Sequence, residues 1–150
     1  MKSYTWAEME DAVLTALQTQ LGDQVKTLRT YQGNWQEDLK RQVWRLPAVL
    51  VMIRENSATQ VSMGSYDLSV HIQILVADRQ WRGEEVARRG EGGVYHLLQE
   101  VRAALWHSDL GLDILPLTLL REEPLLATEE WVVFGAHYHT VMIQDFESQQ

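Results

Sequence analysis

The chain has 150 residues, 45% of them hydrophobic and 23% charged, which are ordinary values for one globular domain. Its 21 acidic and 13 basic residues give a net charge of −8. This argues against a general nucleic-acid binder, which needs positive charge to neutralise phosphate. The absence of cysteine excludes disulfides, a thiolate nucleophile and cysteine-ligated zinc. We therefore expect a single domain, residues 1–150, with a core that buries roughly 70% of the unfolded surface.

No targeting segment is expected. Residues 1–14 lack the apolar stretch and the small-residue cleavage site of a secretory signal. The longest apolar run, residues 46–53, is much shorter than the roughly 20 residues of a membrane-spanning helix. Together with the lack of cysteine, this fits a reducing cytosol.

The first expected element is a helix over residues 5–21. Thr5 and Glu8 have the spacing of a capping box, and Gly22 is suited to end the helix. Apolar residues recur at helical spacing and form one stripe: Trp6, Met9, Val13, Leu17 and Leu21.

The next segments predict strands with a short polar interruption. Residues 25–31 alternate in a β-compatible way, and residues 33–45 suit a short helix or an ordered loop. Pro47 then opens an apolar run, residues 48–53, which is typical of a central strand buried on both faces.

A hairpin is expected after this strand. Residues 54–59 have a turn-like composition, and residues 66–78 show the clearest alternation in the chain. One face of that strand is apolar, and the other carries polar side chains that meet water or a partner. The apolar face consists of Leu68, Val70, Ile72, Ile74 and Val76, and the polar face includes Ser69, His71 and Gln73.

The remainder predicts a loop, a helix and two strands. Residues 79–93 are polar and glycine-rich, and the helix that follows ends near residues 107–108. Pro116 indicates an edge or interrupted strand after residue 111, and a long strand covers residues 131–146. The expected fold is α+β: a mostly antiparallel sheet with two main helices on one face.

Two candidate ligand sites stand out. His137 and His139 lie two residues apart on the last strand, so both face one side and could share zinc with His71 or Asp145. No HExxH motif or carboxylate cluster accompanies them, so we favour ordinary packed or surface histidines and expect no metal.

The second candidate is an anion site, since backbone N–H groups at a helix start can bind phosphate. Three glycines precede the helix, Gly90, Gly92 and Gly93, next to Arg88 and Arg89. The stretch lacks both the P-loop pattern and the dinucleotide-binding pattern, so a mixed-charge loop is the favoured interpretation.

Nothing in the chain predicts catalysis. Residues 63–65 contain a Gly-Ser pair without the frame of a nucleophile elbow. The adjacent pairs Glu122–Glu123 and Glu129–Glu130 are expected to diverge and to lie in solvated turns. We expect neither enzymatic activity nor a cofactor.

The stretch from Leu46 onward resembles a family of small Mu-like prophage proteins. The motifs that carry the resemblance appear in the family's order: LPAVLVMI, YDLSVHIQILVADR, WRGEEVARRGEGGVYHLLQEVRAAL and LGLDILPLTL. The most specific part is RGEEVARRGEGGVYHLLQEVR followed by GLDILPL, and the resemblance covers roughly residues 5 to 146.

This family is similar in element order to phage tail terminators such as the U protein of lambda. The resemblance implies a homohexameric ring that caps the tail tube, stops its polymerisation and meets the head-side connector. DNA would pass through the ring without specific binding. The protein would reside in the virion tail, after assembly in the host cytoplasm.

A ring needs two different contact surfaces on each subunit. Aromatic and arginine side chains are common at such contacts, and six of these residues form the candidate interface. They are Arg79, Trp81, Arg82, Arg88, Arg89 and Trp106. The alternative function is a monomeric domain that binds an anionic ligand through residues 87–93, and a hydrolase using His137 and His139 ranks third.

Overall fold

The computed structural model describes residues 3–80, 89 and 93–146. Its helical elements are α1 (Trp6–Leu21), the 3-10 turn η1 (Gly22–Gln24), α2 (Trp35–Lys40) and α4 (Val94–Leu105). Its strands are β1 (Thr27–Thr30), β2 (Ala48–Ser62), β3 (Ser65–Arg79), β4 (Thr118–Ala127) and β5 (Trp131–Asp145).

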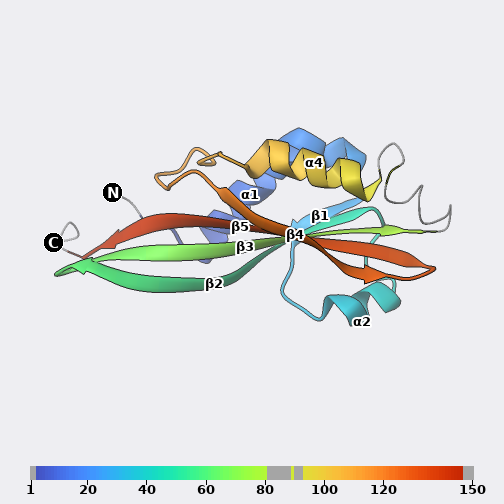
Figure 1. Cartoon of the computed structure of the whole chain (residues 1–150), viewed down its shortest axis with the longest axis horizontal. Helices are drawn as coiled ribbons and strands as arrows, with labels where there is room; N and C mark the ends of the chain where they lie inside the picture. Colours follow the sequence, from blue (N-terminus) through green and yellow to red (C-terminus); the bar gives the residue numbers. More distant parts are fainter. Residues whose placement is uncertain (1–2, 81–88, 90–92, 147–150) are drawn as a thin grey trace.

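The strands form one sheet in the order β1-β2-β3-β5-β4. Only β1 and β2 are parallel, and the other neighbouring pairs are antiparallel. Helices α1 and α4 lie together on one face, whereas the short α2 lies on the other (Figure 1). This confirms the predicted α+β class with two main helices on one face.

Helix α1 begins with the predicted capping box. The Glu8 N–H donates to Thr5 Oγ1, and the Thr5 N–H donates to Glu8 Oε1, both at 3.1 Å. Its buried residues are Met9, Val13, Leu17 and Leu21. Trp6 was expected on the same stripe but is 43% exposed, because the first turn precedes the buried part of the helix.

The main core lies between the sheet and the two helices. Helix α4 buries five side chains there, and they are Val94, Leu97, Leu98, Val101 and Leu105. The predicted apolar face of β3 points toward the same core, in which Val70, Ile72, Ile74 and Val76 are fully buried.

A smaller core forms under α2. Asn34 caps this helix by accepting from the Glu37 N–H, and Leu39 is its buried residue. Tyr31 and Trp44 pack edge to face beside it, with ring centroids 5.2 Å apart. Cores on both faces explain why residues 48–53 of β2 are apolar throughout, as expected of a central strand.

The expected turn at residues 54–59 is wrong. Strand β2 continues through a register shift near Arg54 to Ser62, and the turn falls at Met63–Gly64, where Gly64 has a φ of 80°. Apart from Ala58 and Val61, residues 54–62 are polar because this part of β2 is largely exposed, so their composition reflects solvent contact and not a turn.

Beyond the helices, β2, β3 and β5 continue to one end of the sheet (Figure 1), and Tyr4 and Leu115 contact the part of β5 nearest the helices. We call this end the arm: residues 55–62 of β2, 65–71 of β3 and 139–145 of β5, which remain paired to the tip with one register shift between Gln60 and Ser62. Strand β4 reaches only the first of these β5 residues, because its pairing with β5 stops at Thr118 and His139. The edge strand predicted after residue 111 is β4, but it begins only at Thr118, so Pro116 precedes it. Pro124 lies at a register shift within β4.

Candidate assembly surface

The predicted interface residues are only partly within the described chain. Arg79 is the last residue of β3, and its Nη2 lies 3.4 Å from Gln42 Oε1. Arg89 is exposed. Trp81, Arg82 and Arg88 lie outside the described residues, together with Gly90 and Gly92.

The described members do not form one patch. Trp106 follows the last residue of α4, is 42% exposed, and stacks on His107 with ring centroids 5.2 Å apart. Arg89 precedes the first residue of α4. The 12 residues of this helix separate the two ends by about 18 Å.

Gly93 precedes α4, as expected, and is its N-cap, with no side-chain hydrogen bond at the cap. A helix start with exposed N–H groups is the feature that the anion site requires. Because two of its three glycines lie outside the described residues, the anion site stays a prediction.

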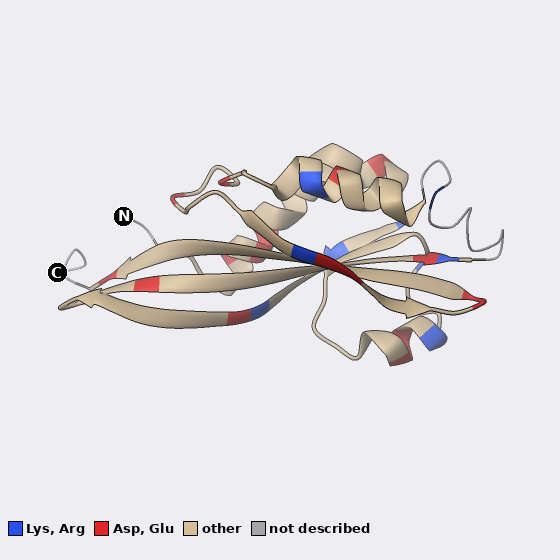
Figure 2. Cartoon of the chain, in the orientation of Figure 1, with Lys and Arg blue, Asp and Glu red and all other residues tan. Residues whose placement is uncertain are grey.

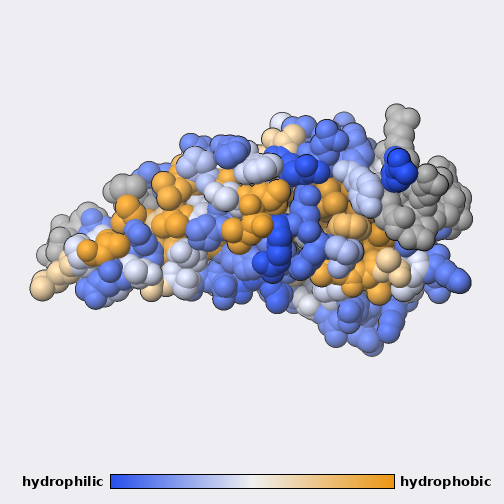
Figure 3. Space-filling view, in the orientation of Figure 1, coloured by the Kyte–Doolittle hydropathy of each residue, from blue (hydrophilic) through white to orange (hydrophobic). Residues whose placement is uncertain are grey.

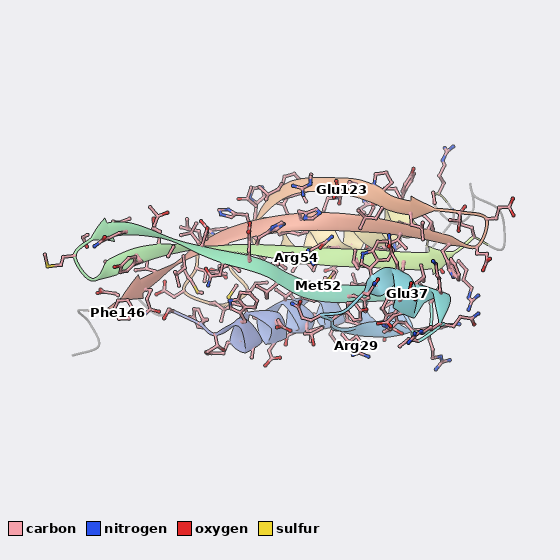
Figure 4. The ribbon with its side chains drawn as sticks, turned by 90° about the horizontal axis from the view of Figure 1, so that it is seen from below. Arg29, Glu37, Met52, Arg54, Glu123 and Phe146 are labelled. Carbon is pink, nitrogen blue, oxygen red and sulfur yellow. The ribbon has the colours of Figure 1, made fainter. Side chains whose placement is uncertain are left out.

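The tip of the arm is apolar, which sequence reasoning missed. Val61, Met63 and Phe146 are 55%, 83% and 54% exposed. Phe146 packs edge to face on Tyr66, with ring centroids 6.0 Å apart, and its N–H donates to the Gly64 carbonyl. Apolar surface is visible at this end in Figure 3, and Figure 4 places Phe146 there. The Met63–Gly64 pair was the available signal, because only glycine readily adopts this turn's positive φ.

Four side chains form a row across the face of the sheet opposite α1 and α4. We call Glu55, His71, His137 and Glu123 the histidine row, and they come from four adjacent strands, β2, β3, β5 and β4. His71 Nε2 lies 2.8 Å from His137 Nδ1, and His137 Nε2 lies 3.1 Å from Glu123 Oε1. At the other end, His71 Nδ1 is 4.0 Å from Glu55 Oε1. Figure 4 views this face and labels Glu123.

The contacts define where the protons lie. A carboxylate only accepts hydrogen bonds, so Nε2 of His137 donates to Glu123 and its Nδ1 accepts from Nε2 of His71. Nδ1 of His71 is then an unprotonated acceptor that faces another acceptor, Glu55. This explains why that contact is long.

Both histidines are held neutral. Burial lowers the pKa of His71, and the neighbouring His137 lowers it further, while Glu55 acts in the opposite direction. Burial also lowers the pKa of His137, followed by the charge of Arg121, and Glu123 opposes both effects. Desolvation by burial therefore lowers the pKa values of the two histidines more than the two carboxylates raise them.

The arrangement differs from the metal site considered for His137 and His139. Of the suggested third ligands, His71 does meet His137, through a hydrogen bond. Asp145 lies eight residues further along the strand, about 26 Å away. Among the residues that the structure describes, no group of three or more histidine, aspartate or glutamate side chains could hold a metal ion.

The expectation that Glu122 and Glu123 lie in a solvated turn is wrong. Both belong to β4, where neighbouring side chains point to opposite faces. Glu122 approaches Arg102 of α4 at 3.2 Å, and Glu123 joins the histidine row. The predicted divergence of this pair is confirmed.

The chain matches the protein family described as bacteriophage Mu, Gp37, over residues 5–143. The chain belongs to the bacteriophage Mu Gp37 family. It is thus a phage protein, and its family places it among the tail-related structural proteins associated with the virion. No curated protein matches it.

This family match confirms the predicted resemblance to Mu-like phage proteins. It covers α1 through residue 143 of β5, so it includes the histidine row and most of the arm. The similarity to the lambda U protein is a separate matter and stays a prediction. Within the described part of this Gp37-family chain, no helix has the length and apolar character needed to cross a membrane.

Proposed function

We propose that the protein is a tail terminator: a homohexameric ring that caps the tail tube and presents a surface to the head-side connector. Membership of the Mu Gp37 family supports a tail-related structural role. The observation that carries the more specific proposal is the arm, which extends past both helices and ends in exposed apolar side chains.

The arm is better suited to a contact than to water. Methionine, valine and phenylalanine at one protruding end form an apolar surface that water solvates poorly. A ring subunit needs surfaces that are completed only by a neighbour or by the tube. The arm supplies such a surface at the end opposite to Arg79, which lies at the far end of β3.

Electrostatics also fits a ring through which DNA passes. The net charge of −8 does not favour retention of DNA. In Figure 2 the basic and acidic segments are scattered along the strands and helices of the visible face. The proposed ring would therefore guide DNA without binding it specifically.

In this proposal the protein acts by complementary surfaces and not by turnover. Its partners are copies of itself, the tube protein and the head-side connector. It would assemble in the host cytoplasm and remain at the head-proximal end of the tail.

Light scattering after size exclusion tests the ring directly. The purified chain should form a concentration-dependent particle of about six copies, seen as annuli in negative stain. Addition of tail tubes should shift the equilibrium toward the ring and place it at the tube end. A chain that stays monomeric at high concentration, both alone and with tubes, would contradict the proposal.

A further inference from the structure

We propose that neighbouring copies join by sheet extension: the free edge of β2 in one arm pairs with the free end of β5 in the next. This inference rests on the proposed ring and names its subunit contact. The evidence comes from the two edges of the arm.

The edge of β2 is open over nine residues. Strand β1 pairs only with Ala48 to Val51 of β2. The Gln32 side chain reaches the Ile53 carbonyl, and no described strand lies beside residues 54–62 on that side. An open edge presents a row of unpaired N–H and C=O groups that can accept another strand.

This edge has little of the usual protection beyond its first two residues. Arg54 and Glu55 are charged, but residues 56–62 contain no charged residue and no proline. The other long edge, β4, carries Arg121, Glu122, Glu123 and Pro124 in its middle. Both edge strands have two register shifts, so the contrast lies in the charges and the proline. Charges and proline are common means of preventing edge-to-edge association. The uncharged stretch, residues 56–62, therefore leaves the β2 edge available for pairing.

The second open edge belongs to the same arm. Pairing between β4 and β5 ends at His139, and the Leu115 N–H then donates to the Val141 carbonyl. No described strand lies beside residues 142–145 on the outer side of β5. This short edge contains one charged residue, Asp145.

Strand direction favours a head-to-tail contact. Both β2 and β5 are antiparallel to β3, so they run parallel to each other toward the tip. Neighbours related by rotation about a ring axis would then bring β2 beside β5 as a parallel pair. One repeated contact then covers the β5 end and the part of the β2 edge nearest the tip, and it closes the ring. A twofold contact between two β2 strands would leave β5 uncovered.

A head-to-tail ring would also bring the tips of the arms together. If all arms point in one direction, Val61, Met63 and Phe146 from every copy gather on one side of the ring. This side would present a continuous apolar rim, suited to the end of the tail tube.

Cysteine cross-linking tests the contact, because the natural chain has no cysteine. Thr59 and Ile143 lie in one row of the arm, each opposite Asp67 of β3. They are two strands apart, about 9.5 Å, which exceeds the roughly 7 Å limit between Cα atoms for a disulfide. A disulfide between Thr59→Cys and Ile143→Cys can therefore form only between copies.

The full-length double variant should give a ladder of covalent oligomers ending at the closed ring after mild oxidation. Two further double variants combine Thr59→Cys with Val141→Cys or with Asp145→Cys. They test a contact whose register is shifted by two residues in either direction. Each single variant should stay unlinked. The matched control combines Thr59→Cys with Leu120→Cys on the other edge strand, β4. The natural Leu120 is 51% exposed, so a cysteine there is accessible, but this variant should not cross-link.

Three results would overturn the inference. Dimers from Thr59→Cys alone would show a twofold β2 contact, and cross-links with Leu120→Cys would show pairing with β4. Rings in negative stain without cross-links in any of the three pairs would place the contact elsewhere and leave the terminator proposal intact. Neither rings nor cross-links, in variants whose thermal melts match the natural chain, would contradict both proposals.

Discussion

The histidine row is the most connected polar feature at the scale of single residues. His137 is only 5% exposed, yet both of its ring nitrogens have partners, His71 and Glu123. Buried polar groups are tolerated when they are hydrogen-bonded. The row therefore joins β3, β5 and β4 by side chains in addition to the backbone ladder.

This row predicts a loss of stability in acid. Both histidines have a folded pKa below the ordinary value of 6.5, so the unfolded chain binds protons more readily than the folded one. The contribution of the two neutral histidines to folding stability is retained above about pH 6.5 and decreases as the pH falls below this value. Urea unfolding at about pH 7.5 and pH 5 should show the decrease.

The double variant His71→Gln, His137→Gln should reduce this pH dependence. It should also unfold more easily at pH 7.5, by about 1 kcal/mol, because hydrogen bonds in the row are lost. The exposed His107, replaced by Asn to suit its φ of 63°, is the control and should leave the pH dependence unchanged. If the double variant loses stability between pH 7.5 and pH 5 as steeply as the natural chain does, groups other than these two histidines cause the loss.

At the scale of elements, local signals predicted the helices well. The capping box and apolar spacing of α1 lie within a few residues of one another, and so does the stripe of α4. The extension of β2 to Ser62 could not be predicted in this way. Polar residues in an exposed strand and in a turn look alike, and only pairing with β3 distinguishes them.

The cap of α1 makes a testable contribution. Thr5→Ala removes the side-chain acceptor for the Glu8 N–H, and we expect the free energy of unfolding to decrease by about 1 kcal/mol. Thr15→Ala is the matched control within the same helix, where its hydroxyl donates only to the Asp11 carbonyl. It should be neutral or slightly stabilising, because alanine favours helix. If urea unfolding shows the same change in stability for Thr5→Ala and Thr15→Ala, the Thr5 cap does not make the expected contribution.

At the scale of the whole molecule, the segment that follows Arg79 in the sequence is the remaining candidate for a partner contact. Trp81 and Arg82 lie outside the described residues, so their role in an interface stays a prediction from the sequence. Their aromatic and guanidinium groups are typical of residues that dominate binding energy.

Alanine at both positions should impair assembly more than folding. We expect the thermal melt of the variant to stay close to that of the natural chain, while tails assembled with it lose their uniform length. The arm remains intact in this variant, which separates its effect from that of sheet extension. A collapsed melt would instead show that Trp81 or Arg82 stabilises the core.

The sequence by itself determined the α+β class, the two main helices and the alternation of β3, because these depend on residues close together in the chain. It also carried the Mu-family motifs. Only the tertiary structure decided that His71 meets His137, that Glu122 and Glu123 serve opposite faces, and that three strands continue as an arm. The physical reason is that strand order and register are set by pairing between distant segments, which no local pattern records.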